Sequence, residues 1–253
     1  MNNPIKNPFT GISMNDIQIK YKTQIEELLE CCRRCAELGY VSSAGGNLSC
    51  RVDADLALIT PTKTMKRTMR FEDICVVDLS GKTVFAPDGK KPTGETPFHI
   101  RILRKRRDLM AVVHAHPPYM TGFAIANSEL LSKPYLPEPV IEAGPILTIP
   151  YETPVSDALS EKFDAVIERS NVFLLENHGA VVCSPRGITD AVEMLQMCEC
   201  MAQSVFVAYM LGNAKPIAAD KMGGLDEVIS ARNLSMPGKS GLFKSASALY
   251  GLE

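Results

Sequence analysis

Two of the four histidines in this 253-residue sequence, His114 and His116, are separated by a single alanine. They end an apolar run over residues 111–115 that is typical of a buried strand. Side chains at i and i+2 of a strand project from the same face, so both imidazoles can reach one point. The pair suits a metal ion, although it can also consist of one hydrogen-bonded core histidine and one surface histidine.

A third histidine, His178, lies in the polar turn Glu176-Asn177-His178-Gly179 between two apolar segments. Gly179 allows a sharp turn and leaves room beside the ring. Three neutral imidazoles with one open position describe a catalytic zinc site, because zinc takes four tetrahedral ligands and needs a free position to act as a Lewis acid. Spacing alone does not show whether His178 meets the other two histidines.

Glu95 is the candidate proton carrier. Pro97 favours a helix that begins near Glu95. A carboxylate at a helix start beside a cation can accept and return a proton, but most glutamates in a first turn only complement the helix dipole. His99 follows four residues later on the same helical face, and we interpret it as a supporting or structural residue rather than a ligand.

Three short loops combine small hydroxyl or amide side chains with glycine or proline. They are Gly45-Gly46-Asn47, Thr60-Pro61-Thr62 and Thr93-Gly94. Backbone N–H groups and such side chains can together cradle a phosphate without a fixed lysine. Each loop taken alone is also an ordinary turn.

The elements that must position these residues follow from hydrophobic periodicity and from glycine and proline. We expect helices over residues 17–35, 95–105, 156–169 and 188–211, with Ser156 as a cap. We expect strands over residues 47–52, 56–60, 74–79, 83–86, 111–115, 171–175 and 180–183. Prolines predict a loop-dominated stretch over residues 133–154 around a short apolar run. These patterns indicate a flexible segment over residues 1–14, one domain over 15–211, and a C-terminal tail over 212–253 that orders against the domain or a subunit surface.

Composition excludes several classes of protein. With 45% hydrophobic and 22% charged residues the chain is globular, and a net charge of -2 argues against a nucleic-acid partner. No apolar run approaches the roughly 20 residues needed to cross a bilayer, so we expect a cytoplasmic protein without a membrane partner. The eight cysteines are expected to be reduced, and Cys32-Arg-Arg-Cys35 is interpreted as part of an apolar helix face.

Five strings in the same order make the chain similar to the class II aldolase/adducin family. They are GGNLSCR from Gly45, ITPT from Ile59, PTGETPFH from Pro92, AVVHAHPP from Ala111 and LLENHG from Leu174. The resemblance implies an α/β fold, a three-layer αβα sandwich around a mostly antiparallel central sheet. It also implies a homotetramer with sites at subunit boundaries.

The resemblance further implies the composition of the site. The ion would be Zn²⁺, with Mn²⁺ or Co²⁺ as alternatives, held by His114, His116 and His178. Glu95 would be the acid/base and could also touch the metal. The phosphate cradle would consist of Gly46, Asn47, Thr62, Thr93 and, through its backbone, Gly94.

The implied reaction is cleavage of a ketose 1-phosphate, such as L-fuculose 1-phosphate, to dihydroxyacetone phosphate and an aldehyde through a metal-stabilised enediolate. The alternative on the same site is decarboxylation of a phosphorylated 3-oxo sugar acid, and dehydration of a methylthioribulose-type substrate is a third option. A non-catalytic, adducin-like assembly module belongs to a different class, against which the retained histidines and Glu95 argue.

The chain departs from the family pattern beside the phosphate cradle. Lys63 stands where family aldolases commonly have glycine, and Gly94 stands where a second serine often binds phosphate. Lys63 either supplies a cation to the cradle or is solvated. Some family members bring a tyrosine from a neighbouring subunit, for which the candidates here are Tyr135, Tyr151 and Tyr250.

Overall fold

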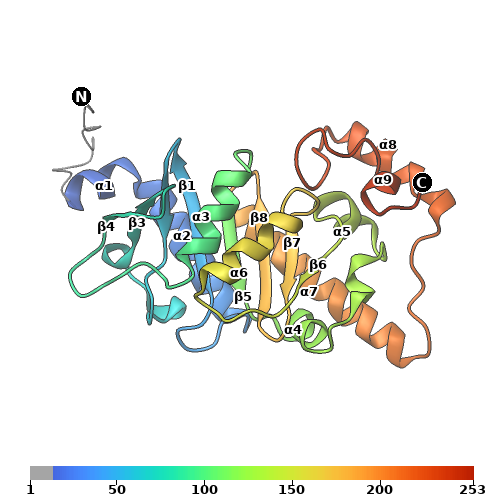
Figure 1. Ribbon diagram of the computed structural model, residues 1–253, viewed down its shortest axis with the longest axis horizontal. Coiled ribbons are helices and arrows are strands. Elements are labelled where there is room, and N and C mark those ends of the chain that lie inside the picture. Colours follow the sequence, from blue (N-terminus) through green and yellow to red (C-terminus); the bar gives the residue numbers. More distant parts are fainter. Residues whose placement is uncertain (1–13) are drawn as a thin grey trace.

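The computed structural model describes residues 14–253, through which a single mixed sheet runs (Figure 1). Its strands follow the order β4-β3-β2-β1-β5-β8-β7-β6, and among these neighbours only β6 and β7 are parallel. The strands are β1 (Asn47–Asp53), β2 (Leu56–Ile59), β3 (Cys75–Asp78), β4 (Thr83–Phe85), β5 (Ala111–Ala115), β6 (Leu147–Ile149), β7 (Val172–Leu175) and β8 (Gly179–Ser184). The expected mostly antiparallel sheet is confirmed.

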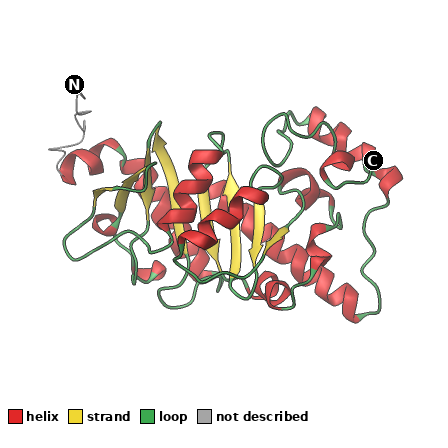
Figure 2. Cartoon of the chain, in the orientation of Figure 1, coloured by secondary structure: helices red, strands yellow, loops and turns green. Residues whose placement is uncertain are grey.

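Helices cover both faces of this sheet (Figure 2). They are α1 (Met14–Lys20), α2 (Lys22–Glu37), α3 (Thr96–Lys105), α4 (Pro118–Ile125), α5 (Pro137–Glu142), α6 (Asp157–Lys162), α7 (Ile188–Met210), α8 (Gly223–Ala231) and α9 (Ala246–Leu249). One apolar cluster joins α2, α4 and α7 to one face, and a second joins α3 and α6 to the other. The three-layer αβα sandwich is therefore confirmed.

The central strand β5 shows why both faces need a helical cover. Val112 faces the cluster under α3, whereas Ala111 and Val113 face the cluster under α2 and α7. All three side chains are fully buried. Strands buried on both sides are expected to be continuously apolar, which is how this strand was located in the sequence.

The N-terminal helical pattern is divided in the structure. α1 ends at Lys20 and α2 begins at Lys22, and Gly39 follows α2 with a φ of +75°. The cysteines of α2 lie in the apolar core, where burial raises the pKa of Cys31 to about 11 and of Cys35 to about 12. This environment confirms the interpretation of Cys32-Arg-Arg-Cys35 as an apolar face.

Two stretches contain more regular structure than the sequence pattern predicts. Residues 133–154 include α5 as well as β6. By contrast, α6 is shorter than the helix expected over residues 156–169, because it ends at Lys162. Ser156 caps α6 as expected, and its hydroxyl accepts a hydrogen bond from the Leu159 N–H at 3.1 Å. Beyond α7, α8 and α9 pack against α5 through Val140, Met222 and Ala246.

The C-terminal segment is fastened to the domain by a buried arginine. Arg106 is 1% exposed, and its guanidinium donates to the Gly238 carbonyl at 2.6 Å and to Asn171 Oδ1 at 3.1 Å. The segment expected to be flexible, residues 1–14, lies outside the described residues except for its last one. None of the helices in the described range is both long and apolar enough to span a bilayer.

Candidate active site

The three histidines predicted as ligands meet at one end of β5. His114 is in β5, His116 follows it, and His178 lies in the turn between β7 and β8. Antiparallel pairing of Ala115 with Ala180 places that turn beside the end of β5. One ligand atom from each histidine lies within 4.8 Å of the others, and His116 Nε2 is 3.2 Å from His114 Nε2.

Glycine is required where the turn approaches the histidines. A Cβ at Gly179 would lie 2.6 Å from both the Ala115 carbonyl oxygen and His116 Cδ2, so a larger residue would displace the ring. Asn177 takes a φ of +54°, which asparagine tolerates better than most residues. The local sequence thus explains how an imidazole at position 178 can reach the strand pair.

Hydrogen bonding and burial keep His114 in the form that binds metals. Its Nδ1–H donates to the Ala180 carbonyl at 2.9 Å, which leaves the Nε2 lone pair directed at the other histidines. Burial, followed by the fields of His178 and His116, holds the pKa of His114 well below its ordinary value. Burial also lowers the pKa of His116. Neutral imidazole is the ligand form.

The donor set fits a divalent ion. Nitrogens that share one tetrahedral zinc ion at about 2.0–2.1 Å lie about 3.3 Å apart, close to the 3.2 Å between the Nε2 atoms of His114 and His116. Glu95 Oε1 and His178 Nδ1 are buried polar atoms without a hydrogen-bond partner in the described part of the chain. The three histidines can therefore hold the ion, with Glu95 beside them.

Glu95 lies between the histidines and the start of α3. It is 7% exposed and immediately precedes the helix, with Oε2 3.4 Å from His114 Nε2 and Oε1 3.6 Å from His178 Nε2. The Asn47 amide donates to Glu95 Oε2 at 2.7 Å. A carboxylate held this way can transfer a proton to or from a substrate atom bound at the metal position.

His99 has a definite contact that the sequence alone did not reveal. Its Nε2–H donates to Asn47 Oδ1 at 2.5 Å, and its Nδ1 accepts from the Ser49 hydroxyl at 2.7 Å. Because His99 is fully buried, its pKa is lowered to about 3 and the ring is neutral. Ser49, His99 and Asn47 thus form a hydrogen-bonded chain that fixes the Glu95 carboxylate. The four-residue spacing from Glu95 was the only signal for His99 in the sequence.

The loops predicted to cradle phosphate lie next to this carboxylate. The Thr93 N–H donates to the Thr60 carbonyl at 3.1 Å, and the Thr93 hydroxyl accepts from the Glu95 N–H at 3.3 Å. Gly46 has a φ of +67°, and a Cβ there would lie 2.9 Å from the His114 carbonyl oxygen. Asn47 uses its side chain to hold Glu95, and Thr62 is tied through its N–H to the Lys91 carbonyl at 3.0 Å.

Lys63 and Gly94, the two residues that depart from the family pattern, each have a distinct local environment in the structure. Lys63 is exposed and has a φ of +53°, a left-handed conformation that favours glycine. A Cβ on Gly94 would lie 2.7 Å from Val155 Cγ1, and Val155 itself has a φ of +68°. Val155 therefore occupies the space that a side chain at position 94 would need.

The candidate tyrosines lie on different parts of the surface and core. Tyr151 is 54% exposed, Tyr135 packs against the cluster of α2, α4 and α7, and Tyr250 packs against the C-terminal helices.

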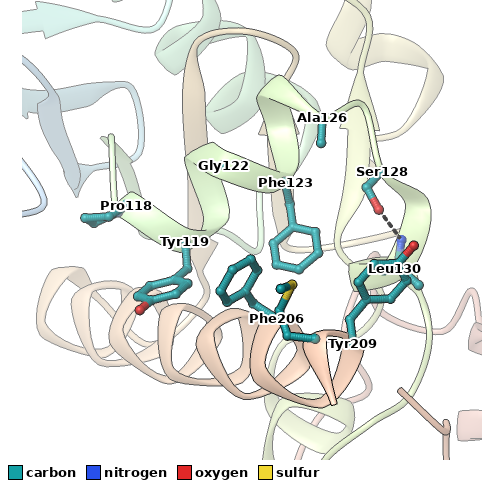
Figure 3. Close-up of a pocket in the computed structure, with 10 residues that line it drawn as sticks. Pro118, Tyr119, Gly122, Phe123, Ala126, Ser128, Leu130, Phe206 and Tyr209 are labelled. Carbon is teal, nitrogen blue, oxygen red and sulfur yellow. Dashed lines mark hydrogen bonds between the residues drawn. The ribbon is translucent and has the colours of Figure 1, made fainter. Parts of the chain in front are cut away.

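An apolar groove is lined by residues that begin with Pro118, two positions after His116 in the sequence. It runs between α4 and α7, starts at Pro118 and has a volume of about 620 Å³. The aromatic side chains of Tyr119, Phe123, Phe206 and Tyr209 line it (Figure 3). Phe206 and Tyr209 are 45% and 60% exposed, so α7 carries apolar surface at its C-terminal end.

Comparison with known proteins agrees with this arrangement. Residues 26–206 match the family described as Class II Aldolase and Adducin N-terminal domain. The chain is 33% identical over 191 residues to L-fuculose phosphate aldolase of Methanococcus maripaludis, covering 76% of this chain and 99% of that protein. It is 32% identical over 162 residues to 3-oxo-tetronate 4-phosphate decarboxylase of Haemophilus influenzae, covering 63% of this chain and 76% of that protein.

A solved structure extends the likeness to three dimensions. The crystal structure of YgbL from Klebsiella pneumoniae, a candidate aldolase/epimerase/decarboxylase, superposes with a TM-score of 0.73 at 27% identity, covering 81% of this chain and 98% of that one. The three histidines, Glu95 and the loops beside them all lie within residues 26–206, the range that matches the family. The chain belongs to the class II aldolase and adducin family.

Proposed function

We propose that the chain is a metal-dependent aldolase that cleaves a ketose 1-phosphate of the L-fuculose 1-phosphate kind into dihydroxyacetone phosphate and an aldehyde. The observation that carries the proposal is the position of Glu95, 3.4 Å and 3.6 Å from two of the three clustered imidazoles. Three imidazole ligands and one adjacent carboxylate suit a reaction that needs both a Lewis acid and a proton carrier. A non-catalytic module would have no use for this combination.

His114, His116 and His178 would hold the ion, for which we propose Zn²⁺, with Mn²⁺ and Co²⁺ also compatible with imidazole ligands. A divalent ion there supplies Lewis-acid polarisation of the substrate carbonyl and neutralises negative charge as the carbon–carbon bond breaks. Burial keeps the His114 imidazole neutral, and the Ala180 carbonyl orients it.

Glu95 would move the proton at the carbon that loses its bond to the departing aldehyde. In the cleavage direction the hydroxyl group that becomes the aldehyde oxygen gives up its proton, and the carbon that keeps the electron pair gains a proton from the Glu95 carboxyl group. In the condensation direction that carbon gives its proton to the carboxylate, and the aldehyde oxygen gains one. Asn47 and His99 keep the carboxylate in place for both steps. Gly46, Asn47, Thr62, Thr93 and the Gly94 backbone would bind the phosphate.

Decarboxylation of a phosphorylated 3-oxo sugar acid is the second candidate. Loss of CO₂ beside a carbonyl places electrons on the same atoms as aldol cleavage, so the same metal position and proton carrier serve both reactions. The similarity to a 3-oxo-tetronate 4-phosphate decarboxylase favours this candidate, and so does Lys63, a cation beside the cradle that could face a carboxylate.

One assay separates these functions. The metal-loaded protein is given dihydroxyacetone phosphate with a panel of aldehydes, and separately a phosphorylated 3-oxo sugar acid. Condensation without CO₂ release supports the aldolase, and CO₂ release without condensation supports the decarboxylase. Purified protein that carries no divalent ion at about one per chain, with neither activity, would contradict both and indicate an assembly role.

We also propose that the chain forms a homotetramer and that the groove between α4 and α7 is covered by a second copy. The groove is apolar, and it begins two residues after His116, so a copy seated there would lie beside the site. This position agrees with the subunit-boundary site that the family resemblance implies. Light scattering on the purified protein should give four times the 27.6 kDa chain mass, and a monomer would contradict the proposal.

A further inference from the structure

A buried lysine, Lys66, lies behind the loops assigned to the phosphate. It begins a short 3₁₀ helix, Lys66–Thr68, that packs against α2, and it is only 2% exposed. Lysine is among the residue types that are almost never fully buried without a partner. The environment of its ammonium group therefore needs a physical explanation.

The ammonium group joins two of the three cradle loops. Lys66 Nζ donates to the Ala44 carbonyl at 3.1 Å and to the Thr64 carbonyl at 3.2 Å. Ala44 precedes Gly45-Gly46-Asn47, and Thr64 follows Thr62 and donates through its hydroxyl to the Thr62 carbonyl at 3.1 Å. One side chain thus fixes the spacing of the loops that contain Gly46 and Thr62.

No carboxylate in residues 14–253 lies within 4.0 Å of this ammonium group. Lys90, in contrast, has a carboxylate partner: its Nζ donates to the Thr64 hydroxyl at 3.2 Å and pairs with Asp73 at 3.3 Å. Burying a cation without an anion is unfavourable. Burial accordingly lowers the pKa of Lys66, against the opposing fields of Cys32 and Glu95.

The charge also lies close to the metal position. Lys66 is one of the groups whose field lowers the pKa of His114 and His116. Gly45, next to the Ala44 carbonyl that Lys66 holds, would place a Cβ 3.3 Å from His116 Cε1. The charge of Lys66 therefore acts on both the cradle loops and the histidines, and an anionic substrate group bound there would balance it.

We propose that Lys66 is a positioning residue of the phosphate cradle, whose ammonium group keeps the loops of Gly46 and Thr62 at the correct spacing and supplies positive charge that a phosphate dianion balances. The proposal rests on the proposed function, since it takes the substrate to be a sugar phosphate. It differs from the sequence-based idea that the exposed Lys63 is the cradle's cation, because Lys66 is the lysine that is both buried and bonded to two of the loops.

The test compares Lys66→Met with Lys90→Met in the metal-loaded protein. Titration calorimetry with inorganic phosphate should show at least a ten-fold weaker affinity for Lys66→Met and an unchanged affinity for Lys90→Met. With substrate, KM should rise for Lys66→Met more than kcat falls, and Lys66→Arg should recover part of the affinity because it restores the charge. If Lys66→Met does not fold, Lys66→Gln, which can donate to one carbonyl without a charge, takes its place.

Equal phosphate affinity in wild type and in the folded variant that lacks the charge would overturn the proposal. Phosphate binding is measured without turnover, so its result is separate from that of the function assay. Loss of phosphate affinity in a protein with no aldolase or decarboxylase activity would support the role of Lys66 and contradict only the proposed function.

Discussion

The proposed metal site, or metal end, and the proposed phosphate cradle are built in different ways. The metal end is set by strand pairing, because the alignment of Ala115 with Ala180 brings His178 beside β5. The cradle is set by loops, in which non-glycine residues with positive φ, such as Lys63 at +53°, stand at or beside the predicted contacts. Lys66 holds two of these loops without a carboxylate partner within 4.0 Å in the described chain.

We connect the metal end with the general chemistry of the reaction and the cradle loops with the choice of substrate. A one-residue slip between β5 and β8 would turn buried side chains to the opposite face, so the sheet strongly specifies where the histidines lie. Loops tolerate substitution and strain, and strained residues persist where function uses them. Some relatives of the chain are named as aldolases and others as decarboxylases, and we expect the loops rather than the histidines to decide the substrate in this chain.

The largest expected effect comes from removing a ligand at the metal end. His116→Ala should lose the bound ion, and with it several kcal/mol of transition-state stabilisation, on the order of 10⁴-fold in rate. Metal analysis after gel filtration and an activity assay measure both losses. Retention of a full equivalent of metal by His116→Ala would show that the three imidazoles do not share one ion.

His99→Asn is the matched control for that experiment. His99 is the remaining histidine of the chain and is outside the group of three that can hold an ion, so this variant should retain the metal. It should lower kcat nevertheless, because Asn47 would lose the hydrogen bond that helps to orient Glu95.

The second-largest effect is expected at Glu95, the proposed proton carrier, which lies between the metal end and the cradle. Glu95→Gln should keep the metal but slow the reaction by about 10²- to 10⁴-fold, since general acid–base catalysis contributes about that much. The specific measurement is exchange of the carbon-bound proton of dihydroxyacetone phosphate with deuterium from the solvent. Exchange at the wild-type rate in this variant would contradict the assignment of Glu95.

Much of the fold could be predicted from local patterns, and the exceptions have physical reasons. The strand over residues 111–115 could be recognised because it is buried on both faces and is therefore continuously apolar. The long helix from Ile188 could be recognised because its buried residues form one continuous apolar stripe. Helix α5 was missed because its prolines at positions 137 and 139 indicated a loop, although proline is tolerated in a first helical turn. Helices α8 and α9 were missed because they depend on packing against α5 rather than on strong periodicity.

The sequence predicted the metal end of the site better than it predicted the cradle loops. Spacing placed His114 and His116 on one face, and only the family resemblance joined His178 to them. Neither source indicated that Lys66 is buried or that Val155 covers Gly94, because both facts depend on how loops distant in sequence meet. Lys63 departs from the family pattern, but Lys66, three positions later, is the lysine that donates hydrogen bonds to the carbonyls of Ala44 and Thr64.

The smallest expected effect concerns backbone strain at Val155, which covers Gly94 of the cradle. Val155 is a β-branched residue at a φ of +68°, a conformation that glycine adopts without penalty. Val155→Gly should therefore stabilise the protein by about 1 kcal/mol, or roughly 2–4 °C in Tm, even though the side chain is removed. Val155→Ala, which removes the two methyl groups but keeps the unfavourable φ, is the control and should give no such gain. An equal rise in Tm for both variants would trace the effect to crowding over Gly94, and a fall for Val155→Gly would show that packing of the valine outweighs its backbone strain.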